Sequence, residues 1–316
     1  MKLPITFSPL RTSGTALPGN LLLAVKLMLF CLIVKGYVLE LPGVWLPMWP
    51  ALDHLPSVAT AKVLKASFCL GTLLVFLHRN VRIGALLCGL PFLLEAVVTR
   101  VGFHYANFFC GCFLVLCGLY RGRASLRWIH LQFVVMYFGS GLNKLLDPDW
   151  RSGHFMDYWL GEIVGSARYG RLTGLLPEGL PALLLSWSSI TIELGLAVLF
   201  LIPRTRRAGV RLAILFHIGS TVLVRDDFGV FVIALLVSFL AFCDWPERGS
   251  VVVHLDTRSV LWRACRRFSR VFDADGIIDW REGGEGSLVL DNRRYRGWEA
   301  FNVWVLLHPI LYFGFA

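Results

Sequence analysis

The residue of this sequence best placed to do chemistry is a lysine at the end of an apolar run. Lys144 is the second-last residue of the segment 136–145 and is followed by an aromatic turn around Trp150. An ammonium group within a bilayer is unfavourable unless it is paired, hydrated or functional, so Lys144 is a candidate functional residue. Desolvation favours the neutral amine, which can then accept a proton as a general base. The alternatives are that the amine reaches the external surface or pairs with Asp147 or Asp149.

Two other ionisable residues, Glu193 and His217, lie deep in later apolar runs. Together with Lys144 they belong to three different predicted helices, at depths where a charge facing lipid is unfavourable. Convergence on one shared cavity would satisfy all three, so we expect them to meet. Lys26 differs, because it lies near the edge of an earlier run and its amine could extend to the membrane surface.

The elements that must position these residues are membrane-spanning helices. Of the 316 residues 56% are hydrophobic and only 16% are charged, against about 25% charged in ordinary soluble domains. The sequence predicts an all-α polytopic membrane protein, a helical bundle of about eight transmembrane spans with a small C-terminal appendage; seven or nine spans also fit. The apolar runs are 19–39, 62–78, 82–99, 101–120, 127–146, 181–202, 208–224 and 228–243.

The charges between these runs predict an orientation. The links 79–82, 121–127 and 204–211 carry arginine and no acidic residue, whereas the connections 40–61 and 147–180 carry Asp and Glu. The positive-inside rule places the arginine links and both termini in the cytoplasm of an integral, multi-pass membrane protein. The net charge of +10 then reflects topology and anionic membrane lipid, and we expect no nucleic-acid partner.

The chain divides into three predicted regions. Residues 1–18 form an N-terminal cytoplasmic arm, 19–245 the transmembrane domain and 246–316 a C-terminal cytoplasmic appendage, which begins where charges and glycines become frequent. Within the appendage, 250–254 and 287–290 have the composition of strands.

Two short segments are predicted to lie on a surface. The external connection contains Phe155, Tyr158, Trp159 and Ile163, a spacing that predicts a short amphipathic helix over the mouth of the bundle. The last run, 300–316, is short and predicts a helix that docks on the membrane or on the appendage. The eight cysteines are scattered without histidines at metal-ligand spacing, so no metal site is expected.

The motif around Lys144 resembles the signature of the vitamin K-dependent gamma-carboxylase family, which is shared by its bacterial relatives, the horizontally transferred transmembrane domain (HTTM) proteins. The similarity covers roughly residues 20–245. It consists of a first motif, a second motif, and later polar positions in the same order. These are Tyr137-Phe138-x-x-Gly141-x-x-Lys144-Leu145, then Asp149-Trp150-x-x-Gly153, then Glu193, Phe216-His217 and Gly229-Val230-Phe231.

The resemblance implies a specific chemistry. In the carboxylases the lysine that matches Lys144 deprotonates a reduced quinone, vitamin K hydroquinone. Oxygenation of this quinol yields a stronger base that removes a proton from a peptide glutamate, so that CO2 can add. An active protein of this kind would be a quinol-dependent carboxylase of the carbon–carbon lyase type. The implied catalytic residues are Lys144 and His217, and the implied quinol- or substrate-binding residues are Asn107, Tyr137, Gly141, Trp150, Glu193 and His104.

The sequence departs from the carboxylase pattern at three places. Asn143 stands where the animal enzyme has a second lysine. Phe108 stands where the family has the histidine of an Asn-His pair, and His104 is a possible substitute. The lumenal region that helps to recognise the peptide has no match in residues 246–316, so the substrate could be a peptide or a small molecule.

Two non-enzymatic functions also fit these residues. In a membrane binding or transport module, Lys144 would be the counter-ion of an anionic ligand or a structural partner of Glu193. In a quinone or lipid sensor, the bundle would bind its ligand and signal through a partner protein.

Overall fold

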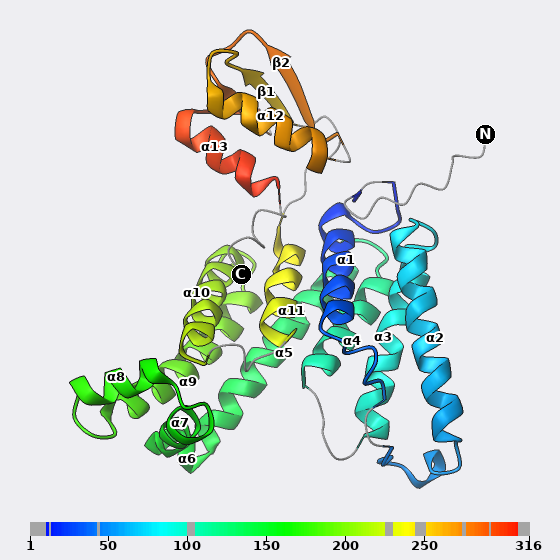
Figure 1. Ribbon diagram of the computed structural model, residues 1–316, viewed down its shortest axis with the longest axis vertical. Coiled ribbons are helices and arrows are strands. Elements are labelled where there is room, and N and C mark those ends of the chain that lie inside the picture. Colours follow the sequence, from blue (N-terminus) through cyan, green and yellow to red (C-terminus); the bar gives the residue numbers. More distant parts are fainter. Residues whose placement is uncertain are drawn as a thin grey trace.

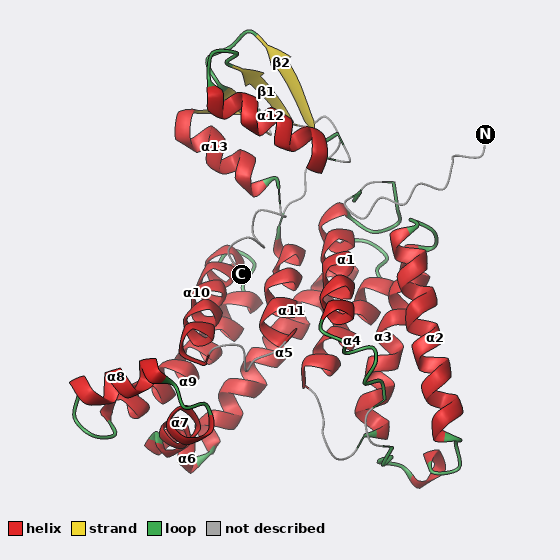
Figure 2. Ribbon diagram, in the orientation of Figure 1, coloured by secondary structure: helices red, strands yellow, loops and turns green. Residues whose placement is uncertain are grey.

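The protein consists of a helical bundle and a small mixed appendage (Figures 1 and 2). The computed structural model describes residues 11–12, 14–42, 45–99, 105–224, 230–243, 251–273, 276–290 and 292–308. Figure 1 shows the appendage at one end of the bundle and the short helices α6–α8, described below, at the other.

A helix lies on each of the eight predicted apolar runs. They are α1 (Gly19–Val34), α2 (Ser57–Phe76), α3 (Val81–Val98), α4 (Tyr105–Gly118), α5 (Arg123–Leu146), α9 (Leu180–Leu201), α10 (Arg206–Val224) and α11 (Val230–Ser238), which continues into η4 (Phe239–Phe242). Within the described residues, four of them are long and apolar enough to cross a membrane: α2, α3, α9 and α10. The prediction of a mostly helical protein with helices suited to a membrane is confirmed, whereas the number of about eight spans stays a prediction.

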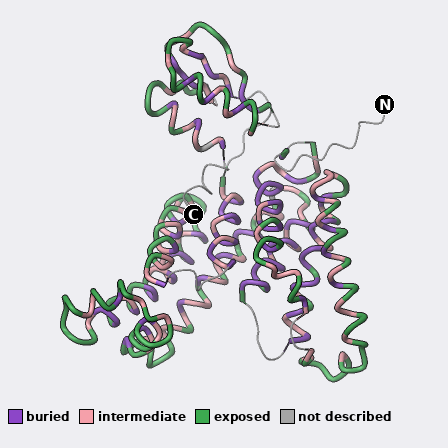
Figure 3. Tube along the Cα trace, in the orientation of Figure 1, coloured by how far each residue is buried: buried purple, intermediate pink, exposed green. Residues whose placement is uncertain are grey.

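The outer faces of the bundle are as apolar as a membrane requires. Figure 3 shows buried residues on the inner faces of the helices and exposed residues on the outer faces. A soluble monomer rarely exposes apolar surface on this scale, so a lipid environment accounts for it. The exposed side chains on the long helices include Leu70, Leu73, Ile83, Leu90, Leu94, Val135, Phe138, Val198, Leu215 and Ile218.

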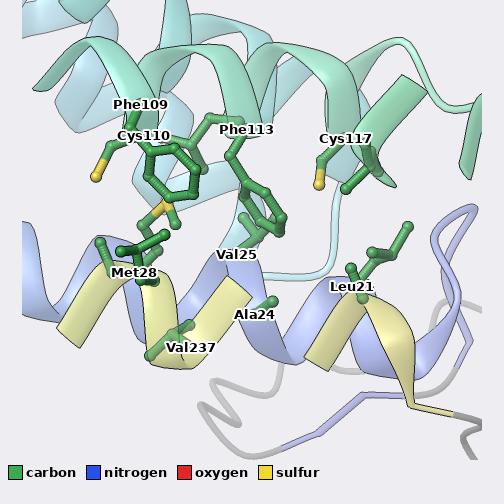
Figure 4. Packing of buried hydrophobic residues seen from close by; sticks show 14 of the residues in the cluster. Leu21, Ala24, Val25, Met28, Phe109, Cys110, Phe113, Cys117 and Val237 are labelled. Atoms are coloured by element: carbon green, nitrogen blue, oxygen red, sulfur yellow. The ribbon is translucent and has the colours of Figure 1, made fainter. Parts of the chain in front are cut away.

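The core of the bundle forms where α1, α4 and α11 pack against one another. Val25 and Met28 of α1 face Phe109 and Phe113 of α4, and Val237 of α11 lies beside them (Figure 4). Cys110 and Cys117 are buried in this cluster as small apolar residues. Such packing holds membrane helices together, because lipid offers no hydrophobic driving force between them.

Close helix contact explains one of the glycines in the fourth apolar run. A Cβ atom added at Gly89 of α3 would lie 2.8 Å from the carbonyl oxygen of Gly111 in α4. Two side chains cannot share this space, so glycine at both positions lets the backbones meet.

The external connection 147–180 folds into several short helices rather than one. They are α6 (Pro148–Ser152), α7 (His154–Tyr158), the π-helical turn η2 (Trp159–Ile163) and α8 (Ala167–Leu175). α7 and η2 lie on the segment 155–163 predicted to be helical, where Tyr158 and Ile163 are exposed while Met156 and Leu160 are buried. A π turn inserts residues into the helical repeat and so rotates the face that follows it. The position of this segment over the mouth of the bundle stays a prediction.

The appendage combines a four-stranded sheet with two helices. Its strands are β1 (Val251–Leu255), β2 (Ile278–Glu282), β3 (Ser287–Leu290) and β4 (Arg293–Arg296), in the order β2-β1-β3-β4. β1 runs parallel to β2 and antiparallel to β3, and β3 pairs antiparallel with β4. The sheet corrects the prediction of an all-α protein, although the two strand-like segments are confirmed as β1 and β3.

The appendage has its own core. α12 (Val260–Phe272) connects β1 to β2 and buries Trp262 and Cys265 against the sheet. α13 (Gly297–Leu306) adds Ala300 and Trp304 to the same core, so the part of the last run that the structure describes docks on the appendage.

The core of the appendage contains a hydrogen-bonded histidine that predicts a pH dependence. His308 Nδ1 lies 2.8 Å from the Trp304 carbonyl, and Nε2 lies 3.0 Å from Ser269 Oγ. Burial lowers the pKa of His308, against the opposing effects of the Trp304 carbonyl and the Asp273 charge. The folded state therefore favours the neutral ring. Its stabilising contribution is present above the unfolded pKa of about 6.5 and is lost as the pH falls through the folded value.

We therefore expect the appendage to lose stability when the pH falls below about 6.5. Hydrogen exchange of the β1 and β3 amides in the full chain, corrected for the intrinsic effect of pH, measures this loss. His308→Gln keeps hydrogen-bonding groups in place but does not titrate, so its loss should be smaller. An identical pH dependence in both proteins would show that His308 is not responsible.

Candidate functional site

The predicted base, Lys144, forms an ion pair inside the bundle. Its Nζ lies 2.6 Å from Glu193 Oε2 and donates a second hydrogen bond to Ser140 Oγ at 2.7 Å. The two charged side chains are only 16% and 10% exposed. The amine neither reaches open water nor pairs with Asp147, whose carboxylate accepts the backbone N–H of Asp149 and caps α6.

The antiparallel contact between α5 and α9 creates this pair. Residues three and four apart share a helix face, so Tyr137, Ser140, Gly141 and Lys144 follow one side of α5. A Cβ atom added at Gly141 would lie 2.9 Å from Leu194 Cγ and 3.1 Å from the Leu194 backbone nitrogen. Glycine at this position lets the two helices approach one turn away from Lys144.

An aromatic ring lies against the charged amine. Lys144 Nζ lies 4.9 Å from the ring centroid of Trp150, a cation–π distance, and Trp150 stacks on Phe155 with centroids 4.5 Å apart. Gly153 ends α6 three residues after Trp150, and its backbone N–H donates to the Trp150 carbonyl. Gly153 has a φ of +82°, and an added Cβ would lie 2.7 Å from the backbone nitrogen of Leu183 in α9.

A second polar pair joins α5 to α10. Tyr137 Oη and His217 Nε2 are 2.8 Å apart, and both residues are buried. Tyr137 precedes Lys144 by seven residues, about two helical turns, on the same helix α5. The structure therefore places the Lys144–Glu193 and Tyr137–His217 pairs along one side of α5, from three helices, while their convergence on one shared cavity stays a prediction.

Asn107 belongs to a different polar contact. Its Nδ2 donates to Glu95 Oε2 at 2.8 Å, across the packed helices α3 and α4, and both residues are buried. Asn107 Oδ1 is buried without a hydrogen-bond partner among the described residues. The other predicted residue of this region, His104, lies outside the described residues, so its proposed role stays a prediction.

The sequence allowed Lys26 to extend to the membrane surface, and its side chain does not do so. Its side chain is fully buried, with Nζ 2.6 Å from the carbonyl oxygen of Arg11 and 2.8 Å from His78 Nε2. The partners come from the N-terminal arm and from the residues after α2, so hydropathy along α1 alone gives no indication of them.

Ser140 is the residue of this site that the sequence analysis missed. It precedes Lys144 by one helical turn, and that spacing is the available signal, since residues four apart on a helix are neighbours.

Comparison with known proteins supports the HTTM resemblance. The family model described as the HTTM domain matches residues 123–245, the stretch from α5 to η4 that contains Lys144, Glu193 and His217. Neither the curated proteins nor the solved structures give a match.

Proposed function

We propose that this chain, whose residues 123–245 carry an HTTM domain, is a membrane enzyme related in chemistry to the vitamin K-dependent carboxylases. Lys144 accepts a proton from a reduced quinone. The observation that carries the proposal is the Lys144–Glu193 pair, 2.6 Å apart and mostly removed from solvent, with Trp150 against the amine. The resemblance of the motif supplies the substrate class.

Glu193 makes the amine available as a base. Transfer of one proton from Lys144 Nζ to Glu193 Oε2 converts two charged groups into a neutral amine and a neutral carboxylic acid. Such a transfer leaves no uncompensated charge in a site of low dielectric constant, where an isolated charge is costly. The neutral amine then takes the hydroxyl proton of the quinol, giving lysine ammonium and a quinol anion.

The remaining residues position these groups. Ser140 Oγ accepts a hydrogen bond from the Lys144 ammonium and so fixes the direction of its Nζ. The Tyr137–His217 pair lies about two helical turns along α5 from Lys144 and offers a second donor and acceptor that can orient a quinol oxygen. Trp150 and Phe155 offer stacked aromatic rings that suit the flat ring of a quinone.

The location of the site completes the proposal. The chain is an integral multi-pass membrane protein with both termini in the cytoplasm, which puts Lys144 near the external face. Membrane lipid surrounds the bundle and delivers the apolar quinol laterally. The acceptor of CO2 would be a peptide or a small molecule, and Asn107 and His104 would contact quinol or substrate from α4 and the residues before it.

Quinol oxidation by the purified chain tests this proposal. The protein in lipid nanodiscs is supplied with vitamin K hydroquinone, menaquinol or ubiquinol, and oxygen consumption is recorded above that of empty nanodiscs. We expect Lys144→Ala to lower the rate by about 100-fold or more, the usual contribution of a general base. Lys62→Ala, on the first turns of α2, is the matched control and should retain the rate. Equal rates for the native chain and Lys144→Ala would overturn the proposal.

The same ion pair favours one second candidate, a non-enzymatic module in which it holds α5 to α9. Glu193 already compensates the charge of Lys144, which argues against a free counter-ion for an anionic ligand. In this case Lys144→Ala lowers stability, and no quinol is consumed by the native chain.

A further inference from the structure

Helix α12 of the appendage has a strongly basic sequence. Its thirteen residues, VLWRACRRFSRVF, contain four arginines and no acidic residue. Trp262, Cys265 and Ser269 form its buried face, and Figure 1 shows the helix in front of strands β1 and β2. One arginine is already compensated, because Arg266 Nη1 lies 2.8 Å from Glu282 Oε1.

The outer face of α12, defined as Val260, Arg263, Ala264, Arg267, Arg270 and Val271, has a second and different character. All six side chains are exposed, and Val260 and Val271 are 72% and 67% accessible. Within the described part of the chain, none of its three arginines forms an ion pair. At 100° per residue the two valines and Ala264 form a narrow apolar strip, and the arginines lie along and beside it.

This combination distinguishes the outer face of α12 from an ordinary solvated helix face. A solvated face carries charges of both signs and few exposed aliphatic side chains. An apolar strip bordered by arginine is typical of helices that lie in a membrane interface, where aliphatic groups enter the acyl boundary and guanidinium groups meet lipid phosphates.

The connection to the bundle keeps this face close to a membrane. Eight residue steps separate Cys243, the end of the last helical segment of the bundle, from Val251 at the start of β1. At no more than about 3.5 Å per residue the tether spans at most about 28 Å. The appendage also lies at the end of the bundle opposite α6–α8 (Figure 1), the end predicted to be cytoplasmic, where anionic lipids are concentrated.

We propose that the outer face of α12 binds the anionic phospholipid headgroups of the membrane in which the bundle lies. The partner is this lipid surface, contacted by phosphate–guanidinium pairs and by shallow insertion of Val260 and Val271. Docking fixes the appendage on the bilayer, and its strength depends on the anionic lipid content and on ionic strength. This inference is independent of the chemistry at Lys144.

The test places a fluorescent probe on this face in the full-length chain. Ala264→Cys is labelled with bimane in a background carrying Cys69→Ser and Cys243→Ser, because both native cysteines are exposed. Nanodiscs contain doxyl-labelled phosphatidylcholine, whose nitroxide quenches bimane only on contact with the bilayer. We expect quenching when phosphatidylglycerol is present, little quenching with phosphatidylcholine alone, and reversal by salt.

Two triple variants separate a specific face from general charge. Arg263→Gln/Arg267→Gln/Arg270→Gln should weaken docking by about 100-fold, or about fivefold for each arginine, and abolish quenching. Arg293→Gln/Arg294→Gln/Arg296→Gln removes the same charge from β4 and should leave quenching intact.

Three outcomes would overturn the inference. They are absent quenching with anionic lipid, equal quenching in both lipids, and equal loss of quenching in both triple variants. The first is also the result expected if an acidic protein or a nucleic acid is the true occupant of this face. If the triple variant of α12 fails to fold, the labelled chain that keeps its arginines still tests the inference. The measurement is then the dependence of its bimane quenching on anionic lipid and on salt.

Discussion

Glu193→Gln is expected to lower the free energy of unfolding of the bundle by about 3 kcal/mol. The substitution keeps the size of the side chain but removes its charge, leaving the Lys144 ammonium between α5 and α9 without a counter-ion. Removing one partner of a buried ion pair lowers the stability by more than the intact pair contributes, because the remaining charge stays desolvated. Unfolding by SDS in mixed micelles measures the change.

A double-substitution cycle shows whether this loss belongs to the pair. Lys144→Met/Glu193→Gln removes both charges. Its loss of unfolding free energy should be smaller, by more than about 1 kcal/mol, than the sum of the losses caused by Lys144→Met and Glu193→Gln separately. Arg266→Gln is the comparison, because it breaks an exposed pair whose Glu282 partner is 66% accessible, and it should cost about 1 kcal/mol or less. A Glu193→Gln protein as stable as the native chain would show that Lys144 is compensated elsewhere.

Gly153→Ala is expected to lower the stability of the bundle by an amount similar to that of Glu193→Gln. Alanine is disfavoured by about 1–2 kcal/mol at a φ of +82°, and its Cβ would overlap the backbone of Leu183 in α9. Relieving an overlap with backbone adds about 1–3 kcal/mol. The shift should also move Trp150 away from Lys144, so we expect lower stability and a lower rate of quinol oxidation.

Gly179→Ala is the matched control for this prediction. Gly179 has a φ of +73° but no atom within 4 Å of an added Cβ, so it shares the conformational cost and lacks the overlap. The difference in SDS unfolding free energy between the two variants therefore measures the contact of Gly153 with α9. Equal losses would mean that this contact does not hold the turn.

The helices of the bundle could be predicted from the sequence because a helix that lies in a bilayer must be apolar along its length, which leaves a continuous apolar run. The rotation of each helix is harder to predict, since a helix that is apolar all round gives no buried face by hydropathy. In α9 the polar residues Ser186, Ser189 and Glu193, spaced three and four apart, mark the buried side. This spacing explains why the meeting of Glu193 with Lys144 was predictable.

Three other features of the fold could not be predicted from the local sequence. Lys26 is satisfied by Arg11 and His78, which come from separate segments, so its burial cannot be inferred from α1. Strands β2 and β4 are edge strands that consist largely of charged residues, a composition that does not predict a strand. The π turn η2 changes the phase of the external helices without a clear sequence signal.

The ability of Lys144 to release a proton within its pair with Glu193 is the central claim, and Lys144→Arg tests it most directly. Arginine retains the charge, the partner and the contact with Trp150, but it does not give up its proton near neutral pH. We expect the variant to unfold at the same SDS fraction as the native chain but to oxidise quinol about 100-fold more slowly or not at all. A Lys144→Arg protein that oxidises quinol at the native rate would contradict the claim.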